Sequence, residues 1–289
     1  MNTQTSRTWI ITGASSGLGN ALARAALRAG ERVVGTARTT ERLEPLARDF
    51  GDSFIPIVHD VRDTDGAAAV IERAIDAFGR IDVLVNNAGL GRVGAAEEVS
   101  DAELRDMLAQ HLFGPAAFVR AALPHMRKRK CGAIVQMSSQ GGRMSFPAVG
   151  SYSAGKFALE GWSEALAGEA RPFGIHVMIV EPSRFRTGFN RAGVLLRSTE
   201  RTDYDGVVGA VRSDMAAGDG VQEGDPDRAA EAIRTALNSS NPPLRLPLGA
   251  EAVRNMTRLY TENLAQVERW SELSTSADFP DAAPSTRAL

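Results

Sequence analysis

The residues with the clearest capacity for chemistry are Tyr152 and Lys156, with Ser139 thirteen positions before the tyrosine. Side chains four residues apart lie on one face of a helix, so the phenol and the ammonium can act at the same point. A neighbouring cation favours the phenolate, and we expect it to lower the pKa of Tyr152 from its reference of roughly 10. Ser139 can hydrogen-bond the same substrate oxygen. The three residues suit proton transfer to or from an alcohol or carbonyl oxygen, which needs a hydride partner.

A glycine-rich loop near the N-terminus predicts a site for that partner. Residues 12–19 read Thr-Gly-Ala-Ser-Ser-Gly-Leu-Gly and lie between an apolar strand pattern and a helical pattern. Gly13 permits a tight turn, while Gly17 and Gly19 let the backbone and helix approach a pyrophosphate. The helix N-terminus would stabilise the negative charge. The residues that we assign to this dinucleotide site are Gly13, Ser15, Ser16, Gly17, Leu18 and Gly19.

The end of the second predicted strand selects between the two nicotinamide dinucleotides. An acidic residue there would hydrogen-bond the adenosine ribose 2′-hydroxyl and favour NAD. The chain instead has Ala37 followed by Arg38, and a cation without a carboxylate suits a 2′-phosphate. We therefore predict NADP(H) as the cofactor, with NAD(H) less favoured. The alternative interpretation is a surface arginine beside the strand end.

Short apolar runs alternate with amphipathic stretches along most of the chain. This alternation predicts an α/β fold, a single-domain doubly wound parallel sheet (Rossmann fold) with helices on both faces. The predicted strands span residues 8–12, 32–37, 53–59, 81–86, 133–138, 176–181 and 244–248. The predicted helices span residues 18–29, 41–50, 65–78, 101–127, 152–171, 227–237 and 250–273. Ser100 and Glu103 form a predicted capping box, and Asp225 with Pro226 predicts a later helix start.

The second half of the chain departs from this rhythm. We expect residues 1–250 to form the dinucleotide-binding and catalytic domain, and residues 251–289 to form a C-terminal helix and a loosely ordered tail. Within the domain, residues 183–224 have no clean period, which predicts an irregular, lid-like connection over the substrate. The side chains expected to line an apolar substrate pocket are Phe146, Pro147, Phe189, Val194, Leu195, Leu196 and Tyr204.

Composition argues against several classes of function. The 33 Lys and Arg residues nearly balance the 35 Asp and Glu residues, so the chain lacks the basic surplus of a general nucleic-acid binder. A single cysteine, Cys131, leaves no internal disulfide, and no residue pattern indicates a metal site. No apolar run approaches membrane-spanning length and no signal-peptide layout is present. We therefore expect a soluble, cytoplasmic protein with no membrane, metal or nucleic-acid partner.

The glycine loop, the run from Asn86 to Gly89, Ser139 and the Tyr152–Lys156 pair together resemble the short-chain dehydrogenase/reductase family. The resemblance runs in order from about residue 8 to residue 187. It implies that Tyr152 is the general acid/base, that Lys156 holds the nicotinamide ribose and lowers the tyrosine pKa, and that Ser139 positions the substrate oxygen.

The resemblance also implies further cofactor contacts and an oligomer. Asp60 and Val61 match the adenine-binding pair, and Thr187 matches the threonine that contacts the nicotinamide carboxamide. The full set of implied contacts is Asp60, Val61, Asn87, Ala88, Gly89, Tyr152, Lys156, Pro182 and Thr187. Members of the family usually form a homodimer or homotetramer through the fourth and fifth helices.

Two positions depart from the family pattern. Ser183 stands where the family usually has glycine, which narrows the allowed backbone there. His111 stands where the family usually places an asparagine of a proton relay, on an apolar helical stripe that turns it toward the sheet. Pro115 cannot donate to the His111 carbonyl. The imidazole could be a structural replacement, an added proton relay, since histidine titrates near neutrality, or an impairment of turnover.

The sequence thus predicts an NADP(H)-dependent oxidoreductase, a short-chain alcohol dehydrogenase or carbonyl reductase. It would interconvert a small-molecule alcohol and a ketone or aldehyde, with Tyr152 as general acid/base. The alternative is an NADP(H)-binding sensor or regulatory protein of the same fold with weak or no turnover. His111 and Ser183 motivate that alternative, whereas the intact Ser139, Tyr152 and Lys156 argue against it.

Overall fold

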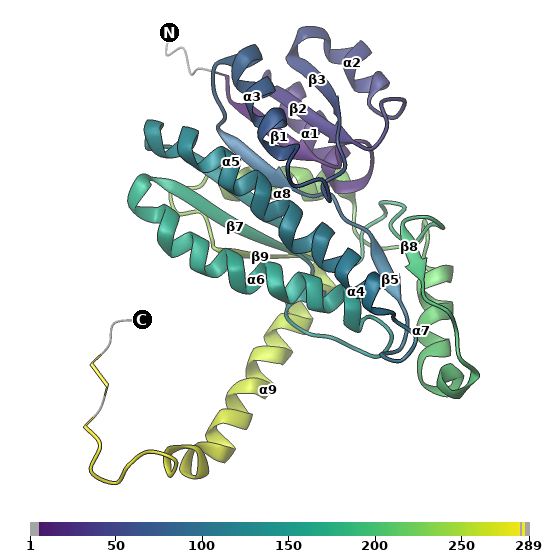
Figure 1. The fold of residues 1–289 in the computed structure, drawn as a ribbon, viewed down its shortest axis with the longest axis vertical. Helices are drawn as coiled ribbons and strands as arrows, with labels where there is room; N and C mark the ends of the chain where they lie inside the picture. Colours follow the sequence, from purple (N-terminus) through teal and green to yellow (C-terminus); the bar gives the residue numbers. More distant parts are fainter. Residues whose placement is uncertain (1–5, 284, 287–289) are drawn as a thin grey trace.

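The computed structural model describes residues 6–283, 285 and 286. Its main sheet has seven strands, all paired in parallel, in the order β3-β2-β1-β4-β6-β7-β9 (Figure 1). The strands are β1 (Thr8–Thr12), β2 (Arg32–Ala37), β3 (Phe54–Val58), β4 (Val83–Asn86), β6 (Gly132–Met137), β7 (Ile175–Pro182) and β9 (Arg245–Leu248). The strand order reverses between β1 and β4, where ligands bind in such sheets. The predicted doubly wound parallel sheet is confirmed.

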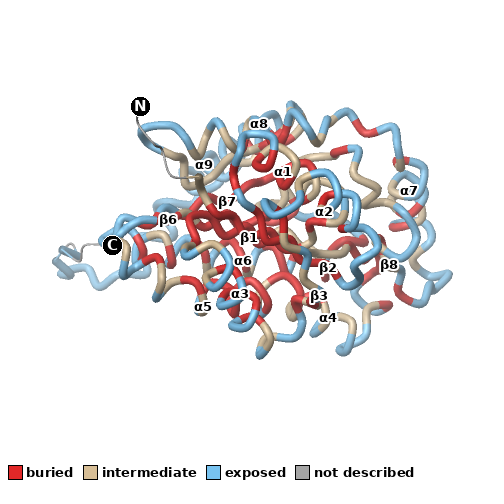
Figure 2. Tube along the Cα trace, turned by 90° about the horizontal axis from the view of Figure 1, so that it is seen from above, coloured by how far each residue is buried: buried red, intermediate tan, exposed pale blue. Residues whose placement is uncertain are grey.

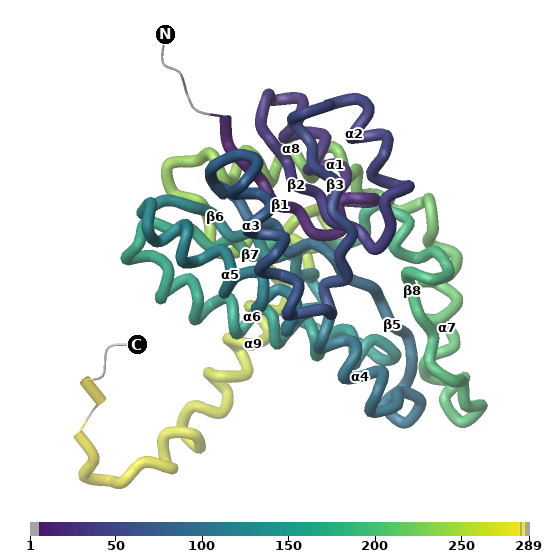
Figure 3. Tube along the Cα trace, turned by 45° about the horizontal axis from the view of Figure 1, so that its top comes forward, coloured from purple at the N-terminus to yellow at the C-terminus, as the bar shows by residue number. Residues whose placement is uncertain are grey.

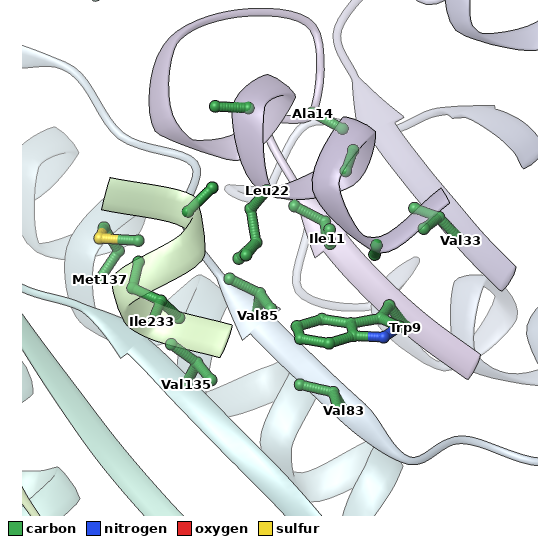
Figure 4. Packing of buried hydrophobic residues seen from close by; sticks show 14 of the residues in the cluster. Trp9, Ile11, Ala14, Leu22, Val33, Val83, Val85, Val135, Met137 and Ile233 are labelled. Atoms are coloured by element: carbon green, nitrogen blue, oxygen red, sulfur yellow. The ribbon is translucent and has the colours of Figure 1, made fainter. Parts of the chain in front are cut away.

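Helices cover both faces of the sheet, because successive residues of a strand point to opposite sides. The helices are α1 (Gly17–Arg28), α2 (Glu44–Phe50), α3 (Ala67–Phe78), α4 (Asp101–Leu108), α5 (Gly114–Arg129), α6 (Gly150–Ala170), α7 (Asp205–Ala217), α8 (Pro226–Leu237) and α9 (Ala250–Thr275). Leu22 of α1 and Ile233 of α8 pack with Val85 on one face (Figure 4). Phe118 of α5 packs with Leu84 on the other face. Figure 2 shows the buried strands enclosed by helices with exposed outer faces.

The fourth predicted helix is not α-helical throughout. The capping box of Ser100 and Glu103 begins α4 as predicted, but a π-helical turn, Ala109–Phe113, separates α4 from α5. The amide of Gly114 donates to the carbonyl of Ala109, five residues back, instead of the four residues back of an α-helix. Pro115 offers no N–H to a carbonyl four residues back, which disfavours a regular α-helix at this point. The predicted helix over residues 101–127 is thus present as an unbroken helical segment, but it contains a π-helical turn that the sequence did not indicate.

The segment 183–224 has more regular structure than the sequence indicated. Strand β8 (Leu195–Arg197) pairs with β5 (Gly91–Val93), and α7 follows. Val208 of α7 packs with Val93 and Leu195 in a small core under this segment. The expectation of an irregular connection is wrong for these elements. Two three-residue strands are too short to show a period, and α7 buries only Val208 and Arg212.

Helix α9 leaves the body of the molecule at its first turns (Figures 1 and 3). Ala252 and Met256 are buried, whereas every described residue from position 260 onward is exposed. The predicted helix over residues 250–273 is present and ends at Thr275. Of the predicted tail, residues 284 and 287–289 lie outside the described residues. Within the described ranges, no helix is both long and apolar enough to cross a membrane.

Candidate active site

The glycine loop between β1 and α1 needs glycine on steric grounds. Gly13 and Gly17 have φ angles of 69° and 56°, in the left-handed region. A Cβ at Gly17 would lie 3.0 Å from the Cβ of Thr187, so the loop also approaches the segment after β7 closely. Ser16 is the N-cap of α1, but its side chain does not cap the helix. The first amides of α1 are therefore available to an anion.

Asn87 ties this loop to the end of β4. Its Nδ2 donates to the carbonyl of Thr12 at 2.9 Å, and the backbone amides of Asn87 and Ala88 donate to Thr12 Oγ1 at 2.9 and 3.0 Å. A Cβ at Gly19 would come within 2.3 Å of Asn87 Nδ2. Gly19 thus allows close packing of α1 against Asn87. It is not among the residues that line the adjoining cavity, unlike the other assigned loop residues.

A cavity of about 650 Å³ extends from the glycine loop to the catalytic candidates. Its wall contains all four of them, Ser139, Tyr152, Lys156 and His111. The predicted cofactor residues in its wall are Gly13, Ser15, Ser16, Gly17, Leu18, Arg38, Asp60, Val61, Asn87, Ala88, Gly89, Tyr152, Lys156, Pro182 and Thr187. The fold therefore brings residues far apart in the chain into one space, beyond the carboxyl ends of the strands.

One end of the cavity wall is rich in arginine. Arg38 lines it together with Arg42 and Arg62, two residues that the sequence did not single out. Asp60 pairs with Arg62 at 2.5 Å. The hydrogen bond from Arg62 lowers the pKa of Asp60, against the opposing effect of burial, and Arg38 adds to the lowering. The carboxylate is thus already paired, and Arg38 and Arg42 bring further positive charge to the same end.

Ser139, Tyr152 and Lys156 lie together as predicted. Ser139 follows β6, and its Oγ accepts a hydrogen bond from the amide of Gly141 at 3.0 Å. The Ser139 hydroxyl is also hydrogen-bonded to the phenol of Tyr152. Lys156 Nζ lies 5.8 Å from the centroid of the Tyr152 ring and donates to the carbonyl of Met137 at 2.8 Å. The first two turns of α6 and the end of β6 therefore position the three groups around one point.

The pKa of Tyr152 shifts in the direction opposite to the prediction. Burial raises it above its ordinary value, and the hydrogen bond with Ser139 only partly opposes this. Burial lowers the pKa of Lys156 to about 7, although the charge of Glu160 works in the other direction. Desolvation thus dominates the pKa of both groups, and the ammonium bonds the carbonyl of Met137. At neutral pH the phenol keeps its proton.

His111 lies in the π-helical turn and faces inward, which confirms the predicted orientation. It is 1% exposed, and its ring stands edge-on to that of Tyr152 with the centroids 5.4 Å apart. Nε2 lies 2.9 Å from the carbonyl of Leu90, which can only accept, so Nε2 carries the proton and Nδ1 is a bare acceptor. Gly89 and Gly155 wall the ring: a Cβ there would lie 2.6 Å from its Cε1 and 3.0 Å from its Cβ, respectively.

The imidazole is held neutral. Burial, and secondarily the charge of Lys156, lower the pKa of His111 well below its ordinary value, while the bond to Leu90 acts weakly in the other direction. The hypothesis of an added proton relay requires an imidazole that titrates near neutral pH. The buried ring of His111 does not titrate there, because its pKa lies well below the ordinary value. Nδ1 is buried without a hydrogen-bond partner among the described residues. The geometry favours a structural role in the wall of the site.

Apolar side chains form the remaining wall of the cavity. The ring of Phe189 lies edge-on to Tyr152 at 5.9 Å. The other large apolar residues on this side are Phe146, Val149, Val194, Leu195, Val211 and Met215. Pro147, Leu196 and Tyr204, which the sequence placed here, do not line the cavity. Leu196 alternates with Leu195 along β8 and so points away, and Tyr204 packs in the small core beside α7.

Ser183 is accommodated without strain. The only described non-glycine residues with positive φ are Lys130 and Ala148, so Ser183 does not need the freedom of glycine. Its amide and hydroxyl both donate to the carbonyl of Leu248, at 3.0 and 3.3 Å. A Cβ at Gly249 would lie 2.4 Å from Ser183 Oγ, so a glycine on the neighbouring strand end provides the room.

Comparison with known proteins agrees with this geometry. A family model described as short chain dehydrogenase matches residues 7–194. Oxidoreductase BOA17 of Botryotinia fuckeliana (strain B05.10) is 34% identical over 93% of this chain and 98% of its own length. The crystal structure of a short-chain dehydrogenase from Streptomyces avermitilis has a TM-score of 0.89 at 44% identity, over 96% of this chain and 100% of that one.

A metagenomic short-chain oxidoreductase solved in complex with NADP has a TM-score of 0.58 and 34% identity, over 62% of this chain and 83% of its own. The matched segment of the family model covers the glycine loop, Ser139, Tyr152 and Lys156. The chain therefore belongs to the short-chain dehydrogenase/reductase family of oxidoreductases.

Proposed function

We propose that the protein is an NADP(H)-dependent oxidoreductase that interconverts an alcohol and a ketone or aldehyde. One observation carries the proposal: a single cavity joins the uncapped N-terminus of α1 and the side chain of Arg38 to Ser139, Tyr152 and Lys156. The first amides of α1 have no side-chain cap, and most loop residues from Gly13 to Leu18 line the same cavity, so the residues present fit a dinucleotide. When bound, a nicotinamide cofactor supplies or accepts the hydride.

The protein's own residues would move and stabilise the proton. In the direction of reduction, the protonated phenol of Tyr152 donates to the carbonyl oxygen of the substrate. Its raised pKa supports this role, since the group holds its proton at neutral pH. The hydroxyl of Ser139, already hydrogen-bonded to the phenol, would hold the same oxygen in place. Lys156, with a pKa of about 7, can be charged when phenolate forms and would stabilise it.

The choice of NADP(H) rests on Arg38, supported by Arg42 in the same wall. A 2′-phosphate beside these guanidinium groups would form charge-assisted hydrogen bonds. Relatives do not decide the matter, because a 3-ketoacyl-(acyl-carrier-protein) reductase from Brucella melitensis, 26% identical with a TM-score of 0.64, was solved with NADH. The cofactor therefore needs a direct test.

The first test removes the phenolic hydroxyl. We expect the wild type to oxidise NADPH with at least one member of a panel of ketones and aldehydes. We expect Tyr152→Phe to lose about 100-fold or more in kcat, the usual contribution of a general acid, and to retain NADPH affinity measured by fluorescence. Tight NADPH binding by a wild type with no Tyr152-dependent turnover would instead support the sensor function.

The second test concerns the cofactor. Arg38→Ala should weaken NADPH binding about tenfold or more, since a hydrogen bond to a charged group contributes roughly 1.5–3 kcal/mol. NADH binding should stay within about twofold. Arg48→Ala is the matched control, because Arg48 is an exposed arginine of α2 outside the cavity wall. Equal affinity of the wild type for NADH and NADPH would overturn the assignment.

A further inference from the structure

Helix α9 exposes a row of large apolar side chains that we call the α9 stripe. Its members are between 45% and 68% exposed, and they are Val253, Tyr260, Leu264, Val267 and Trp270. Val253, Tyr260 and Val267 are seven residues apart, the spacing of a helix that packs along another helix. The charged residues of α9 fall on the opposite side. The helix is thus amphipathic over the part that extends from the body (Figures 1 and 3).

The outer part of α9 lacks the packing that normally stabilises a helix. Ala252 and Met256 anchor its first turns, but all residues from Tyr260 to Thr275 are exposed. Most helical stability in proteins comes from packing of an apolar face rather than from helix propensity. We propose that the α9 stripe packs against the same stripe of a second copy of this chain.

The charges of α9 favour a second copy over a membrane. The helix carries three arginines, Arg254, Arg258 and Arg269, against four glutamates, Glu251, Glu262, Glu268 and Glu272. A helix that lies on a membrane surface typically has a polar face rich in Lys and Arg, and this face is slightly acidic. Two such mixed faces do not repel one another strongly, and a stripe that meets itself about a two-fold axis forms a closed pair.

The exposed area comes close to what such a pair needs. Five half-exposed large side chains, at on the order of 100 Å² each, offer about 500 Å² per copy, somewhat below the roughly 600 Å² per partner at which stable specific interfaces begin. This contact is distinct from the one that the family resemblance implies. That one uses the fourth and fifth predicted helices, which are α4 with α5, and α6.

Molar mass measured by sedimentation velocity on the full chain tests the proposal. Leu264→Glu with Val267→Glu should halve the assembly mass of the wild type. Thr261→Glu with Ala265→Glu adds the same charge to the opposite, exposed face of the same turns and should keep the wild-type mass. Circular dichroism and NADPH binding report whether each variant is folded. A wild type of single-chain mass, or a stripe variant of unchanged mass, would overturn the proposal.

A cross-linking experiment locates the contact. In a Cys131→Ser background, which removes the one native cysteine, Leu264→Cys should form a covalent dimer under mild oxidation, whereas Ala265→Cys should not. Equal cross-linking from both positions would contradict pairing through the stripe. A membrane role would also contradict pairing through the stripe. It would be shown if the wild type, but not the stripe variant, floats with phosphatidylglycerol vesicles while both proteins have the same mass in solution. None of these readouts depends on turnover, so they are independent of the proposed reaction.

Discussion

The phenol of Tyr152 lies among three groups that determine its acidity. His111 and Phe189 stand edge-on to its ring, and Ser139 is hydrogen-bonded to its hydroxyl. The two flanking rings exclude water, which favours the protonated phenol. Because the neighbouring His111 is neutral and Lys156 has a pKa of about 7, little positive charge offsets that effect near neutral pH. This arrangement supports the proposed role of Tyr152 as the proton donor in reduction.

Replacement of His111 tests which of its possible roles is correct. His111→Asn should keep kcat within about threefold, whereas His111→Ala should lose stability by about 1–3 kcal/mol because the partly buried carbonyl of Leu90 loses its donor. The profile of kcat/KM between pH 6 and 9 should have the same shape in the wild type and both variants, since the imidazole stays neutral there. A wild-type inflection near pH 6.5 that disappears in both variants would show a relay instead.

At the scale of elements, an ion pair fastens α7 to the body of the molecule. Glu98 accepts hydrogen bonds from the amides of Ala95 at 2.7 Å and Arg201 at 2.8 Å, and it pairs with Arg212 of α7. The hydrogen bond from Arg212, aided by these amides, lowers the pKa of Glu98 to about 2 against the effect of burial. Since Val211 of α7 lines the cavity, this pair helps to fix one wall of that cavity.

Loss of the Glu98 charge should loosen α7. In Glu98→Gln, amide exchange of α7 should accelerate while that of the central sheet stays unchanged, and KM should rise more than kcat falls. Breaking a buried pair costs about 3–5 kcal/mol. Because the folded-state pKa is depressed, the pair stabilises the fold above pH 4.5 and is lost as the pH falls from 4.5 toward 2. Glu97→Gln, which removes an exposed carboxylate beside it, is the control; equal exchange in both variants would contradict the assignment.

The sequence predicted the elements that have their own periodicity and missed those that depend on distant partners. The inner strands of the main sheet appear as apolar runs because both their faces are buried, whereas the edge strands β3 and β9 are only partly buried. Strands β5 and β8 exist only because residues about a hundred positions apart pair, so no local pattern indicates them. The π-helical turn still directs His111 inward, as a regular helix would, so the apolar pattern of the sequence did not reveal the turn. The pKa of Tyr152 depends on how deeply the fold buries the phenol, which no local pattern could give.

At the scale of the whole molecule, buried ionisable groups of the candidate site lower the stability of the fold. Lys156 is 5% exposed, and Glu181, beside Glu160, is fully buried, so that burial raises its pKa above the ordinary value. A lysine that is charged when unfolded must lose its proton or its hydration on folding. The contribution of Lys156 to the free energy of unfolding therefore changes with pH between its folded pKa of about 7 and its ordinary pKa of 10.5.

This cost has a testable dependence on pH. Between pH 7 and 10.5 the unfolded chain holds more protons on Lys156 than the folded chain, so the wild type should become more stable as pH rises. Relative to Lys156→Met, its free energy of unfolding should increase by roughly 1.4 kcal/mol per pH unit in that interval. Denaturant unfolding at several pH values measures the slope. Lys128→Met, which removes an exposed lysine, is the control, and parallel curves for wild type and Lys156→Met would contradict the prediction.

The two glycines that wall His111 have a consequence for protein engineering. A side chain at Gly89 collides with ring atoms of His111 alone, so that clash disappears once position 111 is made small, whereas a side chain at Gly155 would still meet the Cβ of residue 111 and the carbonyl of Met107. Positions 89 and 111 therefore tolerate change together, and Gly89→Ala should be harmful in the wild type yet mild in His111→Ala. Libraries that vary these sites one at a time would classify Gly89 as immutable, and only combined libraries would reach the alternative arrangements.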